Sequence, residues 1–557
     1  GESNLEKLKN CLDNGGHYSL FEGKGEKYSM IRKAVSVLLI ISFVVSSLVG
    51  CQVQGTSGEA DQKQETGTED QAGEKGKTDA VVSEEGEESQ NQPEEDKGTE
   101  PDVQDEDEPD LSDITLPYFA EAEDGSMEGV KVEKIQSGYS GTGYVGRFEQ
   151  QGNYVEVEIP IPEDGTYEIK IRYFTPFGNK TNNVYVDDRL VEAVTFPESK
   201  EFAEKSLGTF NLEKGLHTAR FQNDPGSWGW MYVDSFIVDR STDQTVWNFD
   251  IKPSLVNPNA DEKTKKVYEY LVSIYGKKTL AAQQLYYSDE REIKEIESVT
   301  GKLPAIKGYD MINQTPGGQI DHQVQHAIDW HVNHKGLVVM CWHWRAPKGG
   351  RSFYTDETTF DITKAVTPGT EEYELVLRDM DAVAEKLKEM EEAGVPVLWR
   401  PLHEASGGWF WWGAKGPEPY IQLWKMMFDR FTNYHKLNNL IWVWNSQHPD
   451  WFVGDEYYDI AGEDIYVPEG VYTAHPVKFG EVYETIGGKK PIALTENGPI
   501  PDPDHMKETG AMWLWFMPWW GDFILDPKYT DREMLKKVYN HELVITLDEL
   551  PDFEAGE

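Results

Sequence analysis

The residues best suited to chemistry lie in the stretch Trp399 to Gly413, WRPLHEASGGWFWWG. A strand-like segment runs into Pro401, which cannot donate to a sheet ladder and so tends to end a strand. His403 and Glu404 follow directly. A carboxyl group beside an imidazole and several indole rings has a pKa that its surroundings can tune. This arrangement indicates an acid/base site.

The aromatic residues after the flexible Ser-Gly-Gly offer flat surfaces, which suit the apolar faces of sugar rings. This aromatic run contains no Leu, Ile or Val against which the rings could pack, which favours a binding site over a core segment. We interpret Trp409 as a sugar contact. Phe410, Trp411 and Trp412 are equally compatible with packing.

The elements that position this stretch alternate in type from Glu262 onward, with amphipathic helical patterns between short apolar strand patterns. Near-continuous apolar strands are typical of parallel sheets covered on both faces. The pattern, over about 290 residues, predicts a (β/α)8 TIM barrel. A doubly wound sheet is the alternative, but no glycine-rich phosphate loop follows the first strand. The expected strands are TLAAQQ, PAIKGYD, GLVVMCWHW, VPVLWRP, NLIWVW, EDIY, KPIALTE and AMWLWF.

Catalytic groups of such a barrel lie at the carboxyl ends of its strands. Glu404 and Glu496 end the fourth and seventh expected strands and would face one mouth. Cleavage of a glycosidic bond needs two such groups, one protonated to assist the leaving oxygen and one ionised. The other strand ends place Asp310, His343, His403, Trp444, Asn445, Tyr466, Trp519 and Trp520 around the same mouth.

The motifs WRPLHEASGGWFWWG, ALTENGP and MCWHW resemble those of glycoside hydrolase family 26, whose members are mainly β-mannanases. The resemblance covers roughly residues 255–553 and implies endo-hydrolysis of mannan, glucomannan or galactomannan by a retaining double displacement, without a cofactor. It implies Glu404 as general acid/base and Glu496 as nucleophile, with Arg400 supporting them. The implied substrate-binding residues are His343, His403, Trp409, Tyr466 and Trp519, with Trp515 as an alternative to Trp519.

Two other functions remain open at this point. The same fold hosts β-1,3-1,4-glucanases and xylanases. A non-catalytic glycan-capture lipoprotein is the third hypothesis. It predicts the loss of a catalytic glutamate, whereas both are present.

Residues 117–240 show a different pattern, with short alternating runs separated by Gly, Pro and Asn turns. Period-2 alternation of this kind predicts an antiparallel β-sandwich. The segments AEAEDG, GYSGTGYVGRF and NDPGSWGWMYVDSFIV resemble carbohydrate-binding modules of family 35 and the related family 6.

The second resemblance implies a jelly-roll fold and two sites. A structural Ca²⁺ site would use Glu121, Glu123 and Asp234, whose hard oxygens suit this ion. Surface acids of an edge strand are the alternative. A sugar-binding position would use Asn223, Trp228 and Trp230, although a tryptophan there is also compatible with a core role.

The N-terminal part carries targeting features. After residues 1–29, which are interpreted as an upstream and untranslated segment, residues 30–51 combine a positive start, an uncharged apolar run and Leu48-Val49-Gly50-Cys51. This pattern resembles the lipobox of bacterial lipoproteins and implies a lipid anchor at Cys51 on the extracellular face of the membrane. A transmembrane anchor is the alternative. Residues 52–116 hold 22 Asp and Glu against 4 Lys and predict an extended, self-repelling tether. A linker at 241–257 then leads to the catalytic domain, 258–553.

The whole chain has a formal net charge of −46, with 99 Asp and Glu against 53 Lys and Arg. This balance argues against nucleic-acid binding, which needs clustered basic residues, and suits a neutral polysaccharide. Three scattered cysteines, Cys11, Cys51 and Cys341, argue against a disulfide framework or a zinc site. Cys341 is expected to be a core residue, and the chain a monomer.

Overall fold

The computed structural model describes residue 111 and residues 113–223, 229–241, 247–286, 290–446 and 448–554. The predicted signal, its Cys51 anchor, most of the acidic tether and Trp228 lie outside these ranges, so secretion and anchoring stay predictions. Within the described ranges, no helix is both long enough and apolar enough to cross a membrane.

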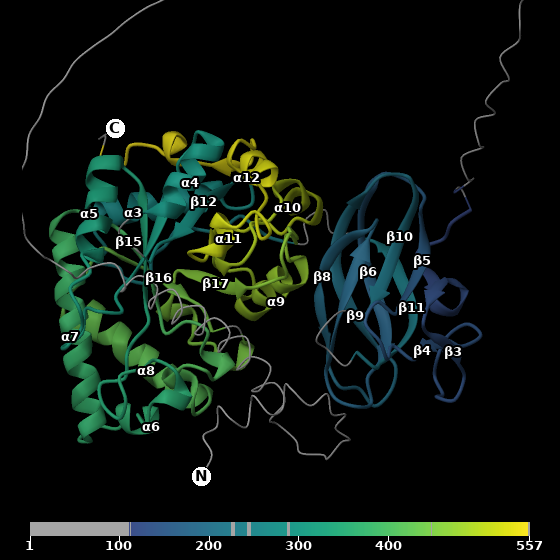
Figure 1. Cartoon of the computed structure of the whole chain (residues 1–557), viewed down its shortest axis with the longest axis horizontal. Helices are drawn as coiled ribbons and strands as arrows, with labels where there is room; N and C mark the ends of the chain where they lie inside the picture. Colours follow the sequence, from purple (N-terminus) through teal and green to yellow (C-terminus); the bar gives the residue numbers. More distant parts are fainter. Residues whose placement is uncertain are drawn as a thin grey trace, which may run out of the picture. The chain divides into compact units, whose positions relative to one another are not determined.

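The first folded region is a sandwich of two antiparallel sheets (Figure 1). One sheet has the order β3-β4-β11-β6-β9 with β1 beside β11, and the other has the order β2-β5-β10-β7-β8. The strands are β1 (Tyr118–Glu121), β2 (Ser126–Glu128), β3 (Lys131–Glu133), β4 (Tyr144–Gly146), β5 (Tyr154–Ile161), β6 (Gly165–Phe174), β7 (Lys180–Val186), β8 (Arg189–Phe196), β9 (Ala203–Leu212), β10 (Gly215–Gln222) and β11 (Tyr232–Arg240), with a 3₁₀ turn at Ala122–Asp124.

The sequence dictates this sandwich through alternation. Along β7 every second residue is buried, beginning at Lys180, and β6 alternates in the same way over most of its length. The inward side chains of the two sheets form one apolar core, which includes Val155, Ile171, Val184 and Phe221. The predicted β-sandwich is confirmed, and β9 is a strand that the alternation analysis did not single out.

The second region is a closed barrel of eight parallel strands in the order β12 to β19, with β12 pairing with both β19 and β13. All residues of β12 to β16 are buried, as expected where helices cover the outer face. The predicted barrel is confirmed. Its strands are β12 (Thr279–Gln284), β13 (Ile306–Asp310), β14 (Leu337–Trp342), β15 (Val397–Pro401), β16 (Leu440–Trp444), β17 (Ile460–Ile465), β18 (Ile492–Asn497) and β19 (Trp515–Pro518); a short β20 (Val544–Ile545) pairs with β12.

Helices surround these strands (Figure 1). Asp261 and Thr370 cap the first turns of α3 and α7 with their side chains, which explains where these helices begin. The α-helices are α3 (Glu262–Ile274), α4 (Arg291–Thr300), α5 (Gln323–His334), α6 (Ile362–Ala365), α7 (Glu371–Glu392), α8 (Pro417–Asp429), α9 (Pro476–Ile486), α10 (Pro503–Thr509), α11 (Asp522–Leu525) and α12 (Arg532–Tyr539).

Two strands depart from their expected positions. The sixth was expected over EDIY, yet β17 begins three residues earlier, at Ile460. The eighth strand was expected over AMWLWF, yet β19 begins only at Trp515 and ends at Pro518. Because of this shift, Trp519 immediately follows the strand and lies at the catalytic end, whereas Trp515 is fully buried at its start.

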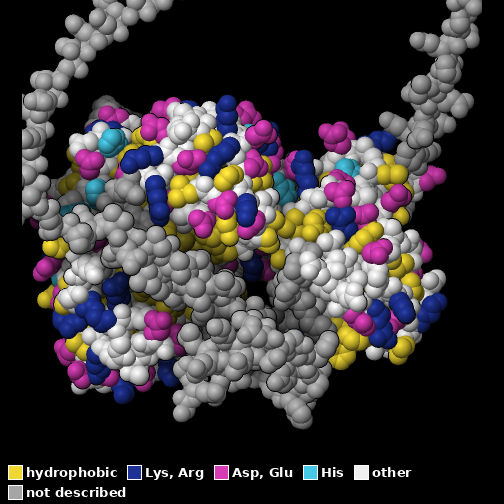
Figure 2. Space-filling model, in the orientation of Figure 1, with side chains coloured by type: hydrophobic (Ala, Val, Ile, Leu, Met, Phe, Trp, Pro, Cys, Tyr) yellow, Lys and Arg dark blue, Asp and Glu magenta, His cyan; other side chains and the backbone are white. Residues whose placement is uncertain are grey.

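Acidic and basic side chains are intermixed on the face of the molecule that Figure 2 shows, and its described part presents no continuous basic field there. The excess of acid is therefore partly local to the tether, which carries −18 of the net −46. This distribution fits the expectation that the ligand is not a polyanion.

Candidate active site

A buried guanidinium group organises the centre of the barrel. Arg400 in β15 is 0% exposed, and it donates from Nη1 to Asp464 Oδ2 at 2.8 Å and from Nη2 to Glu496 Oε2 at 2.5 Å. Burial opposes its charge, but the two carboxylates outweigh burial and raise the pKa of Arg400 above its ordinary value. Arg400 thus stays a cation and fixes two acidic side chains that lie on β17 and β18.

Asp464 has further donors beside Arg400. Its Oδ1 accepts from Asn445 Nδ2 and from Thr495 Oγ1, both at 2.7 Å. These bonds use the remaining acceptor capacity of the carboxylate, as a buried charge requires. Asp464 therefore holds Arg400 in place.

Glu496 also accepts a hydrogen bond from the hydroxyl group of Tyr466, which directly follows β17. The Tyr466 side chain is 45% exposed, while its hydroxyl end lies in the site. Desolvation of that end and the charge of Glu496 raise the pKa of Tyr466 well above its ordinary value, so the phenol keeps its proton and donates. Arg400 thus donates to one oxygen of Glu496 and Tyr466 donates to the other, so the orientation of this carboxyl group is fixed.

Glu404 lies in a different environment although it is close to Glu496. One carboxyl oxygen from each of Glu404, Asp464 and Glu496 lies within 4.8 Å of the other two. Burial, and then the charges of Glu496 and Asp464, raise the pKa of Glu404 well above its ordinary value. A hydrogen bond from Trp409 Nε1 to Oε2, at 2.7 Å, acts in the opposite direction. The two carboxyl groups at the mouth therefore lie in unlike surroundings, and those of Glu404 favour its protonated form.

The turn that carries Glu404 is held by specific bonds. Leu402 and Glu404 both have left-handed backbone angles, with φ of 50° and 53°. The backbone N–H of Glu404 donates to the Asn445 carbonyl at 3.0 Å, and Trp412 Nε1 donates to the His403 carbonyl at 2.8 Å. Such angles cost about 1–3 kcal/mol for a non-glycine residue and persist only where the surroundings impose them. The turn is consequently rigid.

The histidines and one tryptophan form a wall of the site. His343 Nε2 and His403 Nε2 are 3.2 Å apart, and the ring of Trp519 packs against His343 at 5.7 Å between centroids. The predicted catalytic and substrate-binding residues of the barrel thus converge at one mouth. Trp444 does not, because its ring packs against Phe452 and Tyr458. Trp411 and Trp412 are fully buried and are packing residues, as the second interpretation of that run expected.

The sequence did not predict that Asp464 binds Arg400 or that Thr495 donates to Asp464. The spacing contained a signal, since Asp464 precedes Tyr466 by two residues and strand residues two apart share a face. β17 ends one residue after Asp464, with the Asp464 side chain inside the barrel, and the short strand pattern in the sequence did not show this.

The three predicted calcium ligands of the sandwich contact one loop, since the Ser140 hydroxyl lies 2.8 Å from both Glu121 Oε2 and Asp234 Oδ2, and Glu123 binds the backbone just after it. Asp234 is paired with Arg172 and accepts from the backbone N–H of Ser140 at 3.0 Å, so a cation on the protein itself already neutralises it. Glu123 Oε1 accepts from the backbone of Thr142 and Gly143, while its Oε2 is buried with no hydrogen-bond partner among the described residues.

The predicted sugar-binding residues of the sandwich also differ from one another. Asn223 is buried and donates from Nδ2 to the carbonyl groups of Phe148 and Gln150, both at 3.1 Å, so its amide nitrogen holds the loop. The Arg147 guanidinium lies over the Trp230 ring at 5.3 Å. Trp228 lies outside the described residues.

Two carboxyl groups in unlike surroundings at the mouth of a closed parallel barrel fit the acid and the second carboxylate that glycoside hydrolases use. The model of glycosyl hydrolase family 26 matches residues 256–549, and that of carbohydrate binding module family 35 matches residues 118–241. The chain belongs to glycosyl hydrolase family 26 and carries a family 35 module. Both resemblances seen in the motifs are confirmed.

Similar proteins share both regions. Mannan endo-1,4-beta-mannosidase A of Piromyces sp is 38% identical over 80% of this chain and 74% of its own length. Mannan endo-1,4-beta-mannosidase of Thermothelomyces thermophilus is 38% identical over 78% of this chain and 90% of its own length. The crystal structure of a GH26-CBM35 β-(1,4)-mannanase of Podospora anserina is similar with a TM-score of 0.57 at 39% identity, covering 79% of this chain and 99% of that chain.

Replacing Arg400 by Met is expected to lower the free energy of unfolding by about 3–5 kcal/mol, because it leaves Asp464 and Glu496 as uncompensated buried charges. Urea denaturation followed by tryptophan fluorescence measures this change. The control is Lys489→Met, which removes an exposed ion pair with Asp455 and is expected to cost less than about 1 kcal/mol. Equal stability of the Arg400 and Lys489 variants would contradict the role assigned to Arg400.

Proposed function

We propose that this protein is an extracellular endo-β-1,4-mannanase that hydrolyses mannan-type polysaccharides with retention of anomeric configuration. The observation that carries the proposal is the pair Glu404 and Glu496, with carboxyl oxygens within 4.8 Å and surroundings that raise the pKa of Glu404. Retaining enzymes place their carboxyl groups about 5–5.5 Å apart, whereas inverting enzymes leave about 6.5–9.5 Å for a water. The mannan substrate is supported by the activity of the similar fungal enzymes.

The proposed mechanism follows from the charges of the site. Glu496, oriented by Arg400 and Tyr466, attacks the anomeric carbon while Glu404 gives its proton to the leaving oxygen. Glu404, now ionised, takes a proton from the water that hydrolyses the glycosyl-enzyme. The raised pKa of Glu404 fits both steps, since it is an acid near neutral pH and a base after the transfer.

The position outside the cell rests on the secretory pattern of residues 30–50 and the acidic tether that follows. In this proposal Cys51 anchors a monomeric enzyme to the membrane and the tether extends the two folded regions toward the polysaccharide. β-1,3-1,4-Glucanase and xylanase activities are the alternatives on this fold.

Wild-type protein is expected to release reducing sugars from mannan in preference to lichenan and xylan, and proton NMR is expected to show the β-anomer as the first product. Glu496→Ala removes the nucleophile and should lower kcat on mannan by a factor on the order of 10³ or more. Glu508→Ala, an exposed glutamate outside the barrel mouth, is the control. Preferential release from lichenan or xylan would assign the alternative substrate, and an α-anomer as first product would refute retention.

Trp409→Phe is expected to move the alkaline limb of the kcat/KM profile to higher pH. The lost Nε1–H bond stabilises ionised Glu404 and lowers its pKa, so without it the acid keeps its proton to higher pH. Trp411→Phe loses an indole bond to the Trp344 carbonyl instead and is expected to leave the limb in place. A limb that stays in place or moves to lower pH in Trp409→Phe would contradict this assignment.

For the binding module we propose a structural Ca²⁺ ion held through Glu121 and Glu123. The orphaned Glu123 Oε2 supports it. The raised pKa of Glu121 also supports it, since burial and the nearby charges of Glu123 and Asp234 disfavour its ionised form in the absence of a cation. Asp234 is left out of this ligand set because Arg172 neutralises it.

Removing calcium with EDTA is therefore expected to lower a melting transition by several degrees in scanning calorimetry, because an ion bound only to the native state stabilises it by mass action. The transition should respond less to EDTA in Glu123→Gln. An unchanged melting profile of the wild-type protein on EDTA addition would remove the calcium proposal.

A further inference from the structure

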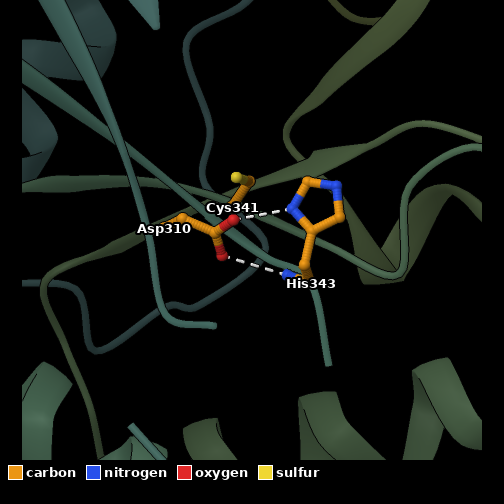
Figure 3. Close-up of side chains that lie close together, drawn as sticks. All are labelled: Asp310, Cys341 and His343. Carbon is orange, nitrogen blue, oxygen red and sulfur yellow. Dashed lines mark hydrogen bonds and ion pairs between the residues drawn. The ribbon is translucent and has the colours of Figure 1, made fainter. Parts of the chain in front are cut away.

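Asp310, the last residue of β13, contacts His343 twice at the barrel mouth (Figure 3). Its Oδ1 accepts the backbone N–H of His343 at 3.0 Å and that of Ile312 at 2.9 Å, and its Oδ2 lies 2.6 Å from His343 Nδ1. Asp310 and His343 are both buried. The contact is therefore shielded from water, and three donors converge on one carboxylate.

Cys341 lies next to this pair, with its sulfur, a carboxylate oxygen of Asp310 and a ring nitrogen of His343 all within 4.8 Å of one another (Figure 3). Burial, and then the charge of Asp310, raise the pKa of the Cys341 thiol well above its ordinary value. Metal binding requires the thiolate. Cys341 is a packing residue here, and the hydrogen bond between Asp310 and His343 is the feature with chemical consequences.

The proton in that hydrogen bond belongs to His343. A carboxylate only accepts hydrogen bonds, and Asp310 Oδ1 already accepts from two backbone N–H groups, so the hydrogen between Oδ2 and Nδ1 lies on the ring. Asp310 is then an acceptor only, and His343 carries hydrogen on Nδ1. In neutral His343 the other nitrogen, Nε2, is left as an acceptor that faces His403 Nε2 at 3.2 Å.

His403 must then donate from Nε2, and its burial supports this direction. Desolvation, and then the positive charge of Arg400, lower the pKa of His403 well below its ordinary value, so the ring is neutral and carries one proton. With that proton on Nε2, the buried Nδ1, which has no partner among the described residues, is a bare lone pair. The reverse direction would bury an unpaired N–H group, which is rarer in proteins than an unpaired acceptor.

We propose that Asp310 is a positioning residue that sets the direction of the hydrogen bonds through His343 and His403 and thereby orients the turn that carries Glu404. His403 is the residue before Glu404, its carbonyl is fixed by Trp412, and the residues on both sides of it have left-handed angles. A rotation of the His403 ring would move this strained backbone. It would thereby displace the proton that Glu404 gives to the leaving oxygen. The proposal rests on the proposed glycosidase function for the role of Glu404.

Asp310→Asn tests the direction of these bonds. The amide oxygen must take the position of Oδ1, because two backbone N–H groups donate there, so the NH₂ group faces His343 Nδ1. His343 is then forced to accept at Nδ1 and to carry its proton on Nε2, which reverses both bonds of the chain. We expect kcat/KM on mannan to fall on the order of 10²-fold, as for other residues that fix a catalytic imidazole.

Two comparisons separate positioning from a merely structural role. Asp381→Asn alters another Asp–His pair, in which Asp381 Oδ1 of α7 lies 2.6 Å from His435 Nε2, and it should keep wild-type kcat/KM. With an aryl β-mannobioside whose leaving group needs no proton, Asp310→Asn should lose much less activity than on mannan. Equal losses on the two substrates would overturn the link to Glu404.

The wild-type protein provides the second test, which needs no variant to fold. ¹⁵N-histidine NMR, with His343→Gln used only to assign the signal, is expected to show Nδ1 of His343 protonated and Nε2 not. An Nε2-protonated His343, or activity of Asp310→Asn within about twofold of wild type, would overturn the proposal. A failure of the mannanase assignment would appear separately, as a wild-type protein inactive on mannan with the expected tautomer.

Discussion

The guanidinium group of Arg400, buried between Asp464 and Glu496, is the interaction on which the rest of the site depends. Transferring an unpaired charge to the interior costs several kcal/mol, so each of these three groups is tolerable only because the others are present. Two negative charges against one positive charge leave a net negative field at the mouth. Burial, and then that field, raise the pKa of Glu404 and favour its protonated form. The same ion pairs therefore set the charge of the nucleophile and, through it, that of the acid.

This field is strong because the surroundings exclude water. The barrel strands present a nearly continuous apolar wall, and large aromatic side chains such as Trp399, Trp411, Trp442 and Trp515 are fully buried around them. Low polarity strengthens every electrostatic interaction inside the site. It also raises the penalty for misplacing a polar group, which explains why Asp464 has three separate donors. The fixed geometry of the site and the raised pKa of Glu404 thus have one cause, which is the exclusion of water.

Sequence patterns predicted the barrel, the sandwich and the two glutamates because these depend on local periodicity and on the rule that barrel chemistry lies at strand ends. They failed where the answer depends on contacts between distant segments. Asp464 became a partner of Arg400 only once β15 and β17 closed around the same interior, 64 residues apart in the chain. The hydrogen bonds from Asn223 Nδ2 to backbone carbonyl groups of another loop were likewise not visible in the sequence, and its role at a sugar stays a prediction.

Asp310 was among the strand-end residues, but no spacing could show that its oxygens face His343. The start of β19 was misplaced for a related reason, since a run of apolar and aromatic residues does not mark where the pairing with β12 and β18 begins. Residue identities thus indicated which groups reach the mouth. The direction of each hydrogen bond between them required coordinates.

The segment Arg400 to Glu404 shows why so few residues carry so much of the chemistry. Arg400 is fixed by the sheet ladder, opposite Cys341 in β14, and its side chain serves the nucleophile. Four residues later the ladder has ended, and Glu404 is fixed instead by a left-handed turn and by bonds from neighbouring strands and loops. The acid and the support of the nucleophile therefore share one backbone segment. Disturbing either end shifts the other, so substitutions at Arg400 and His403 should not act additively, because residues of one bonded network rarely do.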